Sequence, residues 1–308
     1  MNSSTIRVKC PAHYDMMSSI HSWIYPDIQP VPEITKGDVF GRVMTIRSKH
    51  IPVLITQIRN SITVEYSQNE IAENDVREKI QAVLGLNINT SQAIDICTRF
   101  PRLDRIIHSL KSIRPYSSDT IFEGLIKTII QQQISYRAAN AITKRMIAEI
   151  STPTKFNDFE LYQFPQPDEI VEFGLDKLMA LGLGYKSDRI FSISQMVLNG
   201  IFPIENIAKC SHDELVSILR PISGIGEWTI QTLAIAALQD FSVFPYGDLG
   251  IQNLLGNLFN DGIRVSRNFV EEFSNSLGES GPMVLYLLMS ADVLGWLDES
   301  RHPKTPKA

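Results

Sequence analysis

The spacing of hydrophobic residues divides the chain into two parts. From residue 37 to 66, three short β-rich runs alternate with polar breaks at 48–49 and 59–60. The runs occupy residues 39–46, 53–56 and 62–66. Runs of this length, separated by turn residues, predict an antiparallel meander. The preceding segment, 12–24, has helical spacing, and a cluster of prolines follows it.

After about Asn69 this alternation ends, and apolar residues recur every three or four positions. The segments with this spacing are 71–84, 120–130, 138–150, 190–198, 213–219, 228–238 and 282–296. They predict a largely helical body. We therefore expect an α+β protein with a small N-terminal antiparallel β-sheet domain over 1–68 and a large all-α region over 69–308.

The composition is that of a globular protein. Of the 308 residues, 44% are hydrophobic and 20% are charged, and no apolar run approaches the length of a membrane span. The first ten residues lack the apolar stretch of a signal peptide. We expect a soluble intracellular protein, cytoplasmic in a prokaryote or nuclear in a eukaryote, that does not bind membranes.

The cysteines and histidines give no sign of a metal or a cofactor. Cys10, Cys97 and Cys210 are odd in number and far apart, which provides neither metal-ligand spacing nor a disulfide framework. Three cysteines also exclude a four-cysteine iron–sulfur cluster. The histidines show no ligand or catalytic-triad spacing. We therefore expect no metal and no cofactor.

The net charge argues mildly against a nucleic-acid partner. The formal charge is −5, whereas many DNA-binding proteins carry a basic excess that displaces counterions from phosphates. This objection weakens if backbone N–H groups at helix starts hold the phosphates, because such contacts need few lysines.

A helix-hairpin-helix is predicted over 211–238. Ser211 and Glu214 have the spacing of a capping box, which begins a helix, and Pro221 disfavours its continuation. The Gly-x-Gly at 224–226 supplies two residues that can adopt positive φ, and helical spacing then resumes.

Glycines beside a helix start allow phosphate oxygens to approach backbone N–H groups and the positive end of the helix dipole. Such binding is blind to base sequence. A second Gly-x-Gly lies at 182–184, also between an ending and a beginning helix. A single motif of this kind favours an ordinary turn between packed helices, since short motifs match by chance.

Further motifs surround the hairpin in a fixed order. They are Phe122-Glu123, IIQQQIS at 129–135, FPQP at 164–167, Leu181-Gly182-Leu183 with Lys186, EWT at 227–229 and VFPYGDLG at 243–250. Their order and spacing resemble the helix-hairpin-helix (HhH-GPD) DNA glycosylases, specifically the AlkA-type 3-methyladenine glycosylases, over about 114–255. The resemblance implies a glycosylase body with a DNA-binding hairpin at 211–238 and a catalytic loop at 243–250.

Three positions depart from that family. Ser223 stands where relatives often have proline. Met283 and Ala291 lie near the positions where bacterial relatives carry an arginine and aromatic residues. The shape of the base pocket and the range of lesions therefore stay open.

Asp248 directly precedes the segment 249–252, where an aspartate is typical of a helix N-cap. The resemblance implies a catalytic task as well, in which the carboxylate faces C1′ of a flipped nucleotide and either stabilises the cationic sugar or orients the attacking water. A fixed anion suits this task because glycosidic cleavage passes through an oxocarbenium-like state. An alkylated purine is already cationic and leaves easily, so one carboxylate suffices.

Trp228 stands where, by the same resemblance, strand-cleaving relatives place a lysine nucleophile. An indole cannot form a Schiff base, so we expect base excision without lyase activity. The alternatives for Trp228 are a core tryptophan and an aromatic wall that stacks on a cationic base. Tyr246 is a weaker candidate for the same wall.

The resemblance places Gln133 on a loop that enters the duplex, fills the gap left by the flipped nucleotide and bonds the orphaned partner base. The alternative is a polar helix end. The residues that the resemblance assigns to the DNA backbone are Ser223, Gly224, Ile225, Gly226 and Thr229. The basic residues nearby, which we expect on solvated helix faces, are Lys144, Arg145, Lys186 and Arg189.

The expected function is that of a monomeric glycosylase that excises alkylated purines, of the 3-methyladenine and 7-methylguanine type, from damaged double-stranded DNA in base excision repair. Two alternatives stay open. One is an oxidised-purine glycosylase with lyase activity, against which the missing lysine at Trp228 counts. The other is a non-catalytic DNA-binding module, in which Asp248 and Gln133 would have no task.

Overall fold

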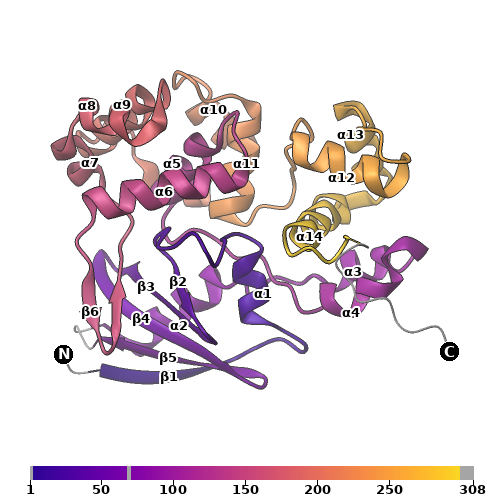
Figure 1. Cartoon of the computed structure of the whole chain (residues 1–308), viewed down its shortest axis with the longest axis horizontal. Coiled ribbons are helices and arrows are strands. Elements are labelled where there is room, and N and C mark those ends of the chain that lie inside the picture. Colours follow the sequence, from indigo (N-terminus) through magenta and orange to yellow (C-terminus); the bar gives the residue numbers. More distant parts are fainter. Residues whose placement is uncertain (1–2, 68–70, 299–308) are drawn as a thin grey trace.

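The computed structural model describes residues 3–67 and 71–298, and it confirms an α+β architecture (Figure 1). The N-terminal part is a five-stranded antiparallel sheet with the strand order β1-β5-β4-β3-β2. Its strands are β1 Ser3–Lys9, β2 Ile34–Lys36, β3 Val39–Ile46, β4 Lys49–Ile58 and β5 Ser61–Ser67. Strands β3 to β5 form the predicted meander, whereas the short edge strand β2 was not predicted.

The breaks between these strands are tight turns. Arg47, Ser48 and Arg59 adopt positive φ values of 48°, 61° and 54° at the two predicted breaks. Strand β1 was not predicted, although Ile6 and Val8 alternate with polar residues and are buried against β5. The predicted N-terminal helix is the short α1 Met16–His21, which Asp15 caps.

Helix α2 (Glu73–Val83) shares the core of the sheet. Val76, Ile80 and Val83 are buried in the same hydrophobic cluster as the strands. The sheet unit therefore extends past residue 68, where the sequence pattern placed the domain boundary. The hairpin of β6 (Thr154–Phe156) and β7 (Phe159–Leu161), which was not predicted, packs on β3 and β4.

Two helical lobes stand above the sheet in Figure 1. The hairpin lobe contains α5 Ile121–Gln131, α6 Tyr136–Ile150, α7 Pro167–Phe173, α8 Leu175–Leu178, α9 Lys186–Leu198, α10 His212–Leu219 and α11 Glu227–Leu238. The C-terminal lobe contains α3 Ser91–Cys97, α4 Ile107–Leu110, α12 Leu249–Phe259, α13 Arg267–Ser276 and α14 Gly281–Val293. Short 3-10 or π turns occupy Pro101–Ile106, Met179–Leu183, Ile204–Lys209 and Gly278–Ser280. All seven predicted helical segments are confirmed, with ends that differ by a few residues.

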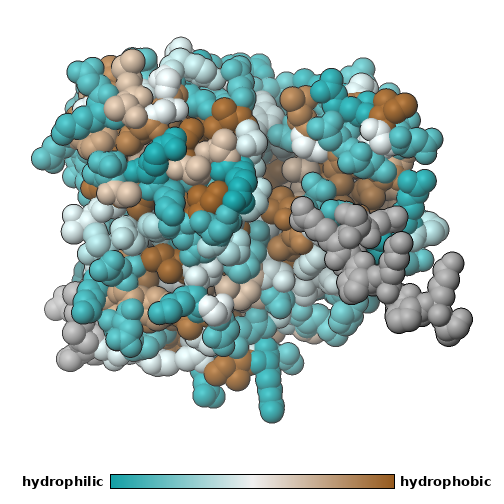
Figure 2. All heavy atoms as spheres, viewed as in Figure 1, coloured by the Kyte–Doolittle hydropathy of each residue, from teal (hydrophilic) through white to brown (hydrophobic). Residues whose placement is uncertain are grey.

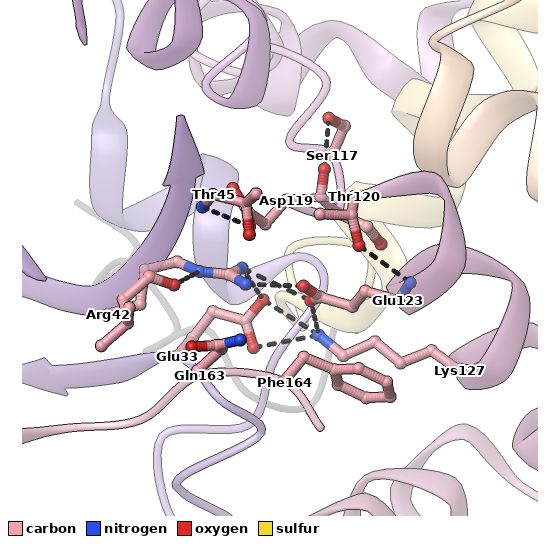
Figure 3. A network of polar contacts seen from close by, with 12 residues as sticks. Glu33, Arg42, Thr45, Ser117, Asp119, Thr120, Glu123, Lys127, Gln163 and Phe164 are labelled. Atoms are coloured by element: carbon pink, nitrogen blue, oxygen red, sulfur yellow. Dashed lines mark hydrogen bonds and ion pairs between the residues drawn. The ribbon is translucent and has the colours of Figure 1, made fainter. Parts of the chain in front are cut away.

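A buried cluster of four charges joins the sheet to α5 (Figure 3). Arg42 on β3 is fully buried and pairs with Glu33 at 3.0 Å and Glu123 at 2.6 Å. Lys127 contacts the same two carboxylates at 3.0 and 2.7 Å. Burial by itself would raise the pKa of Glu123, but the charges of Arg42 and Lys127 lower it to about 2. The cluster fixes α5, whose C-terminal end leads into the loop of Gln133.

Candidate active site

A cavity of about 1320 Å³ lies where the two helical lobes meet. The hairpin, the end of α5 and the first turns of α11 and α12 line it, together with one face of α14. In the space-filling view a hollow separates the two lobes, and hydrophobic residues border it (Figure 2). The motifs at 129–135, 224–229 and 243–250, which lie far apart in sequence, therefore converge on one cavity.

Asp248 is both a helix cap and a lining residue of this cavity. Its Oδ1 accepts hydrogen bonds from the backbone N–H groups of Gly250 at 2.7 Å and Ile251 at 3.3 Å, which caps α12. Its Oδ2 accepts a hydrogen bond from the Trp228 indole at 2.9 Å. Three donors thus hold one half-buried carboxylate in a fixed orientation at the cavity wall.

Trp228 lies in the first turn of α11, where it is half-buried and lines the cavity. The bond from Nε1 to Asp248 fixes the plane of the ring. Trp228 is therefore not a core tryptophan. No lysine occurs among the described residues that line the cavity. The amine of Lys186 instead bonds the carbonyl of Ile130 at 2.6 Å, and that of Lys127 is engaged in the buried charge cluster.

A largely aromatic and apolar wall, which the sequence did not reveal, lines the cavity from α14. Tyr286, Met289, Ser290 and Val293 line the cavity at the spacing of one helix face. Trp23, which follows α1, also lines the cavity and donates from its indole to the Tyr286 hydroxyl at 2.7 Å.

Two positions on the final helix, Met283 and Ala291, were noted above as departures from the family pattern. Neither lines the cavity. Both are buried in the C-terminal lobe, at 7% and 0% exposure. Helix α14 is apolar almost all round, so its sequence periodicity does not distinguish the cavity face from the core face.

Tyr246 does not line the cavity either. Its ring packs beside Phe244 at 6.2 Å between centroids, and its hydroxyl points to Ser274 Oγ at 3.4 Å. The neighbouring Phe244 and Pro245 take its place in the lining. The prediction of Tyr246 as a base-pocket residue is therefore wrong in its geometry, because the loop turns this ring into the C-terminal lobe.

The hairpin forms as predicted between α10 and α11. Ser211 and Glu214 make the capping box, and α10 ends at Leu219, just before Pro221. Gly224 has a positive φ of 81°. Gly226, in contrast, adopts extended backbone at φ −100° and ψ −179°, which any residue can adopt, so the expectation of two positive-φ glycines holds for one of them.

The first turn of α11 is open to an anion. Its N-cap is Gly226, and none of the described side chains caps it. Its first N–H groups are therefore left without a side-chain partner, and Ser223, Ile225, Gly226 and Thr229 around them line the cavity. Arg267 pairs with Glu227 at 2.8 Å and so offsets the one acidic charge of this turn.

Gln133 lies on the loop between α5 and α6, as predicted. It is exposed at the cavity, with a φ of 58°, and its Oε1 accepts a hydrogen bond from the Tyr185 hydroxyl at 3.0 Å. Ser135 caps α6 through the N–H of Ala138.

The four nearby basic residues differ in how far they are exposed to solvent. Lys144 and Arg145 lie exposed on α6, in agreement with a solvated face. Lys186 is 4% exposed, and burial together with the charge of Arg189 lowers its pKa. Arg189 is half-buried, lies over the Tyr185 ring at 4.8 Å and lines the cavity. For these last two, the expectation of a solvated face is wrong.

Within residues 3–67 and 71–298, no group of three or more histidine, cysteine or acidic side chains is arranged to hold a metal ion. Among the helices of this described part, none is both long enough and apolar enough to cross a bilayer.

Comparison with known proteins agrees with this geometry. The sequence profile of the HhH-GPD superfamily base excision DNA repair protein matches residues 126–277. DNA-3-methyladenine glycosylase 1 of Schizosaccharomyces pombe is 30% identical over 181 residues, which cover 58% of this chain and 75% of the relative. DNA-3-methyladenine glycosylase of Bacillus subtilis is 22% identical over 78% of each chain.

A solved structure shares almost the whole fold. The 3-methyladenine DNA-glycosylase from Archaeoglobus fulgidus superposes with a TM-score of 0.82 at 23% identity, over 93% of this chain and 98% of that one. The range matched by the profile, 126–277, includes the hairpin and the loop of Asp248. The chain belongs to the HhH-GPD superfamily of base excision DNA repair proteins.

Proposed function

We propose that this DNA glycosylase of base excision repair is monofunctional and removes alkylated purines, of the 3-methyladenine and 7-methylguanine type, from double-stranded DNA. The observation that carries the proposal is the bond between Trp228 and Asp248 at the wall of the cavity. It places an aromatic face and an oriented anion side by side. A flipped nucleotide needs both of them.

In the proposed reaction, the damaged nucleotide leaves the helix and its base enters the cavity. Trp228, Tyr286 and Trp23, which line the same cavity, would offer aromatic rings to a cationic base. The carboxylate of Asp248 stabilises the positive charge that develops on the sugar as the base departs. A water molecule then attacks C1′ and loses a proton. The product is an abasic site in an intact strand.

The proposed absence of lyase activity rests on the chemistry of the lining. Strand cleavage by a glycosylase requires an amine that attacks C1′ and forms an imine. The described lining residues include no lysine, and the amines of Lys127 and Lys186 are held elsewhere. An oxidised-purine glycosylase with lyase activity is therefore the less favoured alternative.

We further propose that the protein binds DNA as a monomer, through phosphates at the hairpin. Backbone N–H groups of Ser223, Gly224 and Gly226 and the first turn of α11, with the Thr229 hydroxyl nearby, would hold the strand, while the N–H of Ile225 is engaged in the turn itself. Arg189 and Arg220, which line the same side, add positive charge. This arrangement explains how a chain of net charge −5 can bind DNA. Gln133 would fill the gap that the flipped nucleotide leaves.

The test is to incubate the protein with methylated DNA and identify the released bases by chromatography. We expect 3-methyladenine and 7-methylguanine from the wild type and neither from Asp248→Asn. Release of 8-oxoguanine from oxidised DNA, without release of methylated purines, would favour the oxidised-purine alternative. Binding without release of any base would favour the non-catalytic module.

A further inference from the structure

The side chain of Gln132 ties three separate elements together at the end of α5. It is the C-cap of this helix and is 8% exposed. Its Nε2 donates to the carbonyl of Gly224 and to the Thr229 hydroxyl, both at 2.9 Å. Its Oε1 accepts from Arg189 Nη1 at 2.8 Å. One buried amide thus bonds the hairpin, the first turn of α11 and helix α9.

The hairpin leaves room for this contact. Gly224 has a φ of 81°, and a Cβ atom at this position would lie 2.0 Å from Arg189 Nε. The glycine therefore leaves the space in which Arg189 crosses the hairpin to reach Gln132. The hairpin also has internal hydrogen bonds, from Ile222 to Leu219 and from Ile225 to Ile222, so its turn does not depend on Gln132.

The residue next to Gln132 is in a strained conformation. Gln133 has a φ of 58°, in the left-handed region that residues other than glycine rarely adopt. Strain of this kind persists where the surroundings hold it in place. The Gln133 side chain contacts the exposed Tyr185 hydroxyl, whereas the buried Gln132 amide, one residue earlier, anchors the loop.

We propose that Gln132 is a positioning residue that couples the hairpin to the loop of Gln133. The Gly224 carbonyl fixes the Gln132 amide, so the loop of Gln133 keeps one position relative to a hairpin that is bound to the phosphates. The amide then holds Gln133 in its left-handed conformation, aimed at the duplex. Insertion would thereby depend on a correctly seated backbone. This inference rests on the proposed function and deepens it, because it says how binding at the hairpin leads to base flipping.

The test compares Gln132→Met, which keeps the length and removes all three hydrogen bonds, with two matched variants. Gln132→Glu keeps an acceptor for Arg189 and loses the donors to Gly224 and Thr229. Gln57→Met is the control for losing a bonded glutamine, because Gln57 accepts from Met16 N at 2.7 Å and donates to Arg59 O at 3.1 Å, within the sheet domain.

Four quantities are measured for each variant: thermal stability, affinity for undamaged duplex, and single-turnover excision from duplex and from single-stranded DNA. Flipping is followed separately by the fluorescence of 2-aminopurine next to the lesion, in the Asp248→Asn background, where no base is cut. This readout does not depend on excision. A wild type that releases no base would refute the proposed function and leave the coupling testable.

We expect Gln132→Met and Gln132→Glu to lower duplex excision by about tenfold, as for the loss of one to two buried hydrogen bonds, and to lose the fluorescence rise. Single-strand excision and affinity for undamaged duplex should stay within about twofold, because the hairpin stands without Gln132. Gln57→Met should change stability only.

Several results would overturn the coupling. One is equal loss on duplex and single strands, and another is loss of binding to undamaged DNA, since each would mean that Gln132 merely supports the fold or the hairpin. Unchanged duplex excision in either Gln132 variant, or a duplex-specific loss in Gln57→Met, would do the same.

Discussion

Helices α11 and α12 begin at the same cavity, yet their N-termini are built in opposite ways. Helix α11 starts at Gly226, and no described side chain caps it. Helix α12 starts at Asp248, whose carboxylate accepts from the N–H groups of Gly250 and Ile251. Trp228, in the first turn of α11, links the two ends through its bond to Asp248.

This difference separates two tasks that both involve negative charge. The open end of α11 offers free amides and a positive dipole to an anion from outside, which is what a DNA phosphate provides. The first N–H groups of α12 are already bonded by the Asp248 carboxylate, whose charge would repel a phosphate and stabilise a developing cation. We infer that one helix end holds the strand and the other acts on the sugar.

The largest expected effect comes from removing the anion at α12. Asp248→Asn keeps the size of the side chain and one acceptor for the cap, but it removes the charge. We expect single-turnover excision to fall below about one hundredth of the wild-type rate, with affinity for lesion DNA roughly unchanged. A tenfold loss of rate corresponds to a barrier raised by roughly 1.4 kcal/mol. If the variant keeps more than about a tenth of the wild-type rate, another group supplies the charge.

The next effect comes from disrupting the hairpin that leads into α11. Valine at Gly224 would be strained at φ 81° and would clash with Arg189, so Gly224→Val together with Gly226→Val should abolish binding to damaged and undamaged DNA alike. Fluorescence anisotropy measures the affinity, and circular dichroism must first show an intact fold. If binding were lost for damaged DNA only, the glycines would instead shape the base pocket.

A subtler change makes α11 resemble α12. Gly226 has the extended backbone of an N-cap and open space where a Cβ would lie, so Gly226→Asp should cap the helix. We expect stability to rise by about 0.5 kcal/mol, while affinity for undamaged duplex falls by about tenfold at low salt, because the new carboxylate competes with the phosphate. Thermal melts and salt titrations measure the two.

The variant Gly226→Ser introduces an uncharged N-cap and so distinguishes the effect of the added charge from the effect of the cap itself. It should give a smaller loss of affinity than Gly226→Asp, with a similar gain in stability. If Gly226→Asp left DNA affinity unchanged, the open end of α11 could not be where the phosphate binds.

The smallest effect is expected at Gln133, which touches neither helix end. Gln133→Ala should weaken binding to lesion duplex by roughly threefold and leave single-strand binding unaffected, as expected for the loss of about one hydrogen bond to the orphaned base. Parallel titrations with both substrates decide this point. An equal loss on the two would contradict a role inside the duplex.

The features that the sequence predicted well are those set by neighbouring residues. The limits of α10 follow from Ser211, Glu214 and Pro221, and the cap at Asp248 precedes its helix directly. The β meander follows from alternation interrupted by turns. In each case the physical cause lies within a few positions of the chain.

The features that the sequence did not reveal depend on tertiary packing. Trp23 and Tyr286 form one wall although they are 263 positions apart. The cavity face of α14 is hidden because the helix is buried almost all round. Tyr246 has an aromatic side chain suited to a base pocket, yet the path of its loop directs the ring into the C-terminal lobe.

The central claim is that Asp248, with water and without an amine, completes the reaction, and borohydride trapping tests it most directly. The protein is incubated with lesion duplex under conditions of full base release, with and without borohydride, and the strand is then analysed before and after alkali. We predict no covalent protein–DNA adduct and strand breaks only after alkali, because no imine forms. A stoichiometric trapped adduct would show that a lysine, such as Lys127 or Lys186, reaches C1′, and would contradict the monofunctional mechanism.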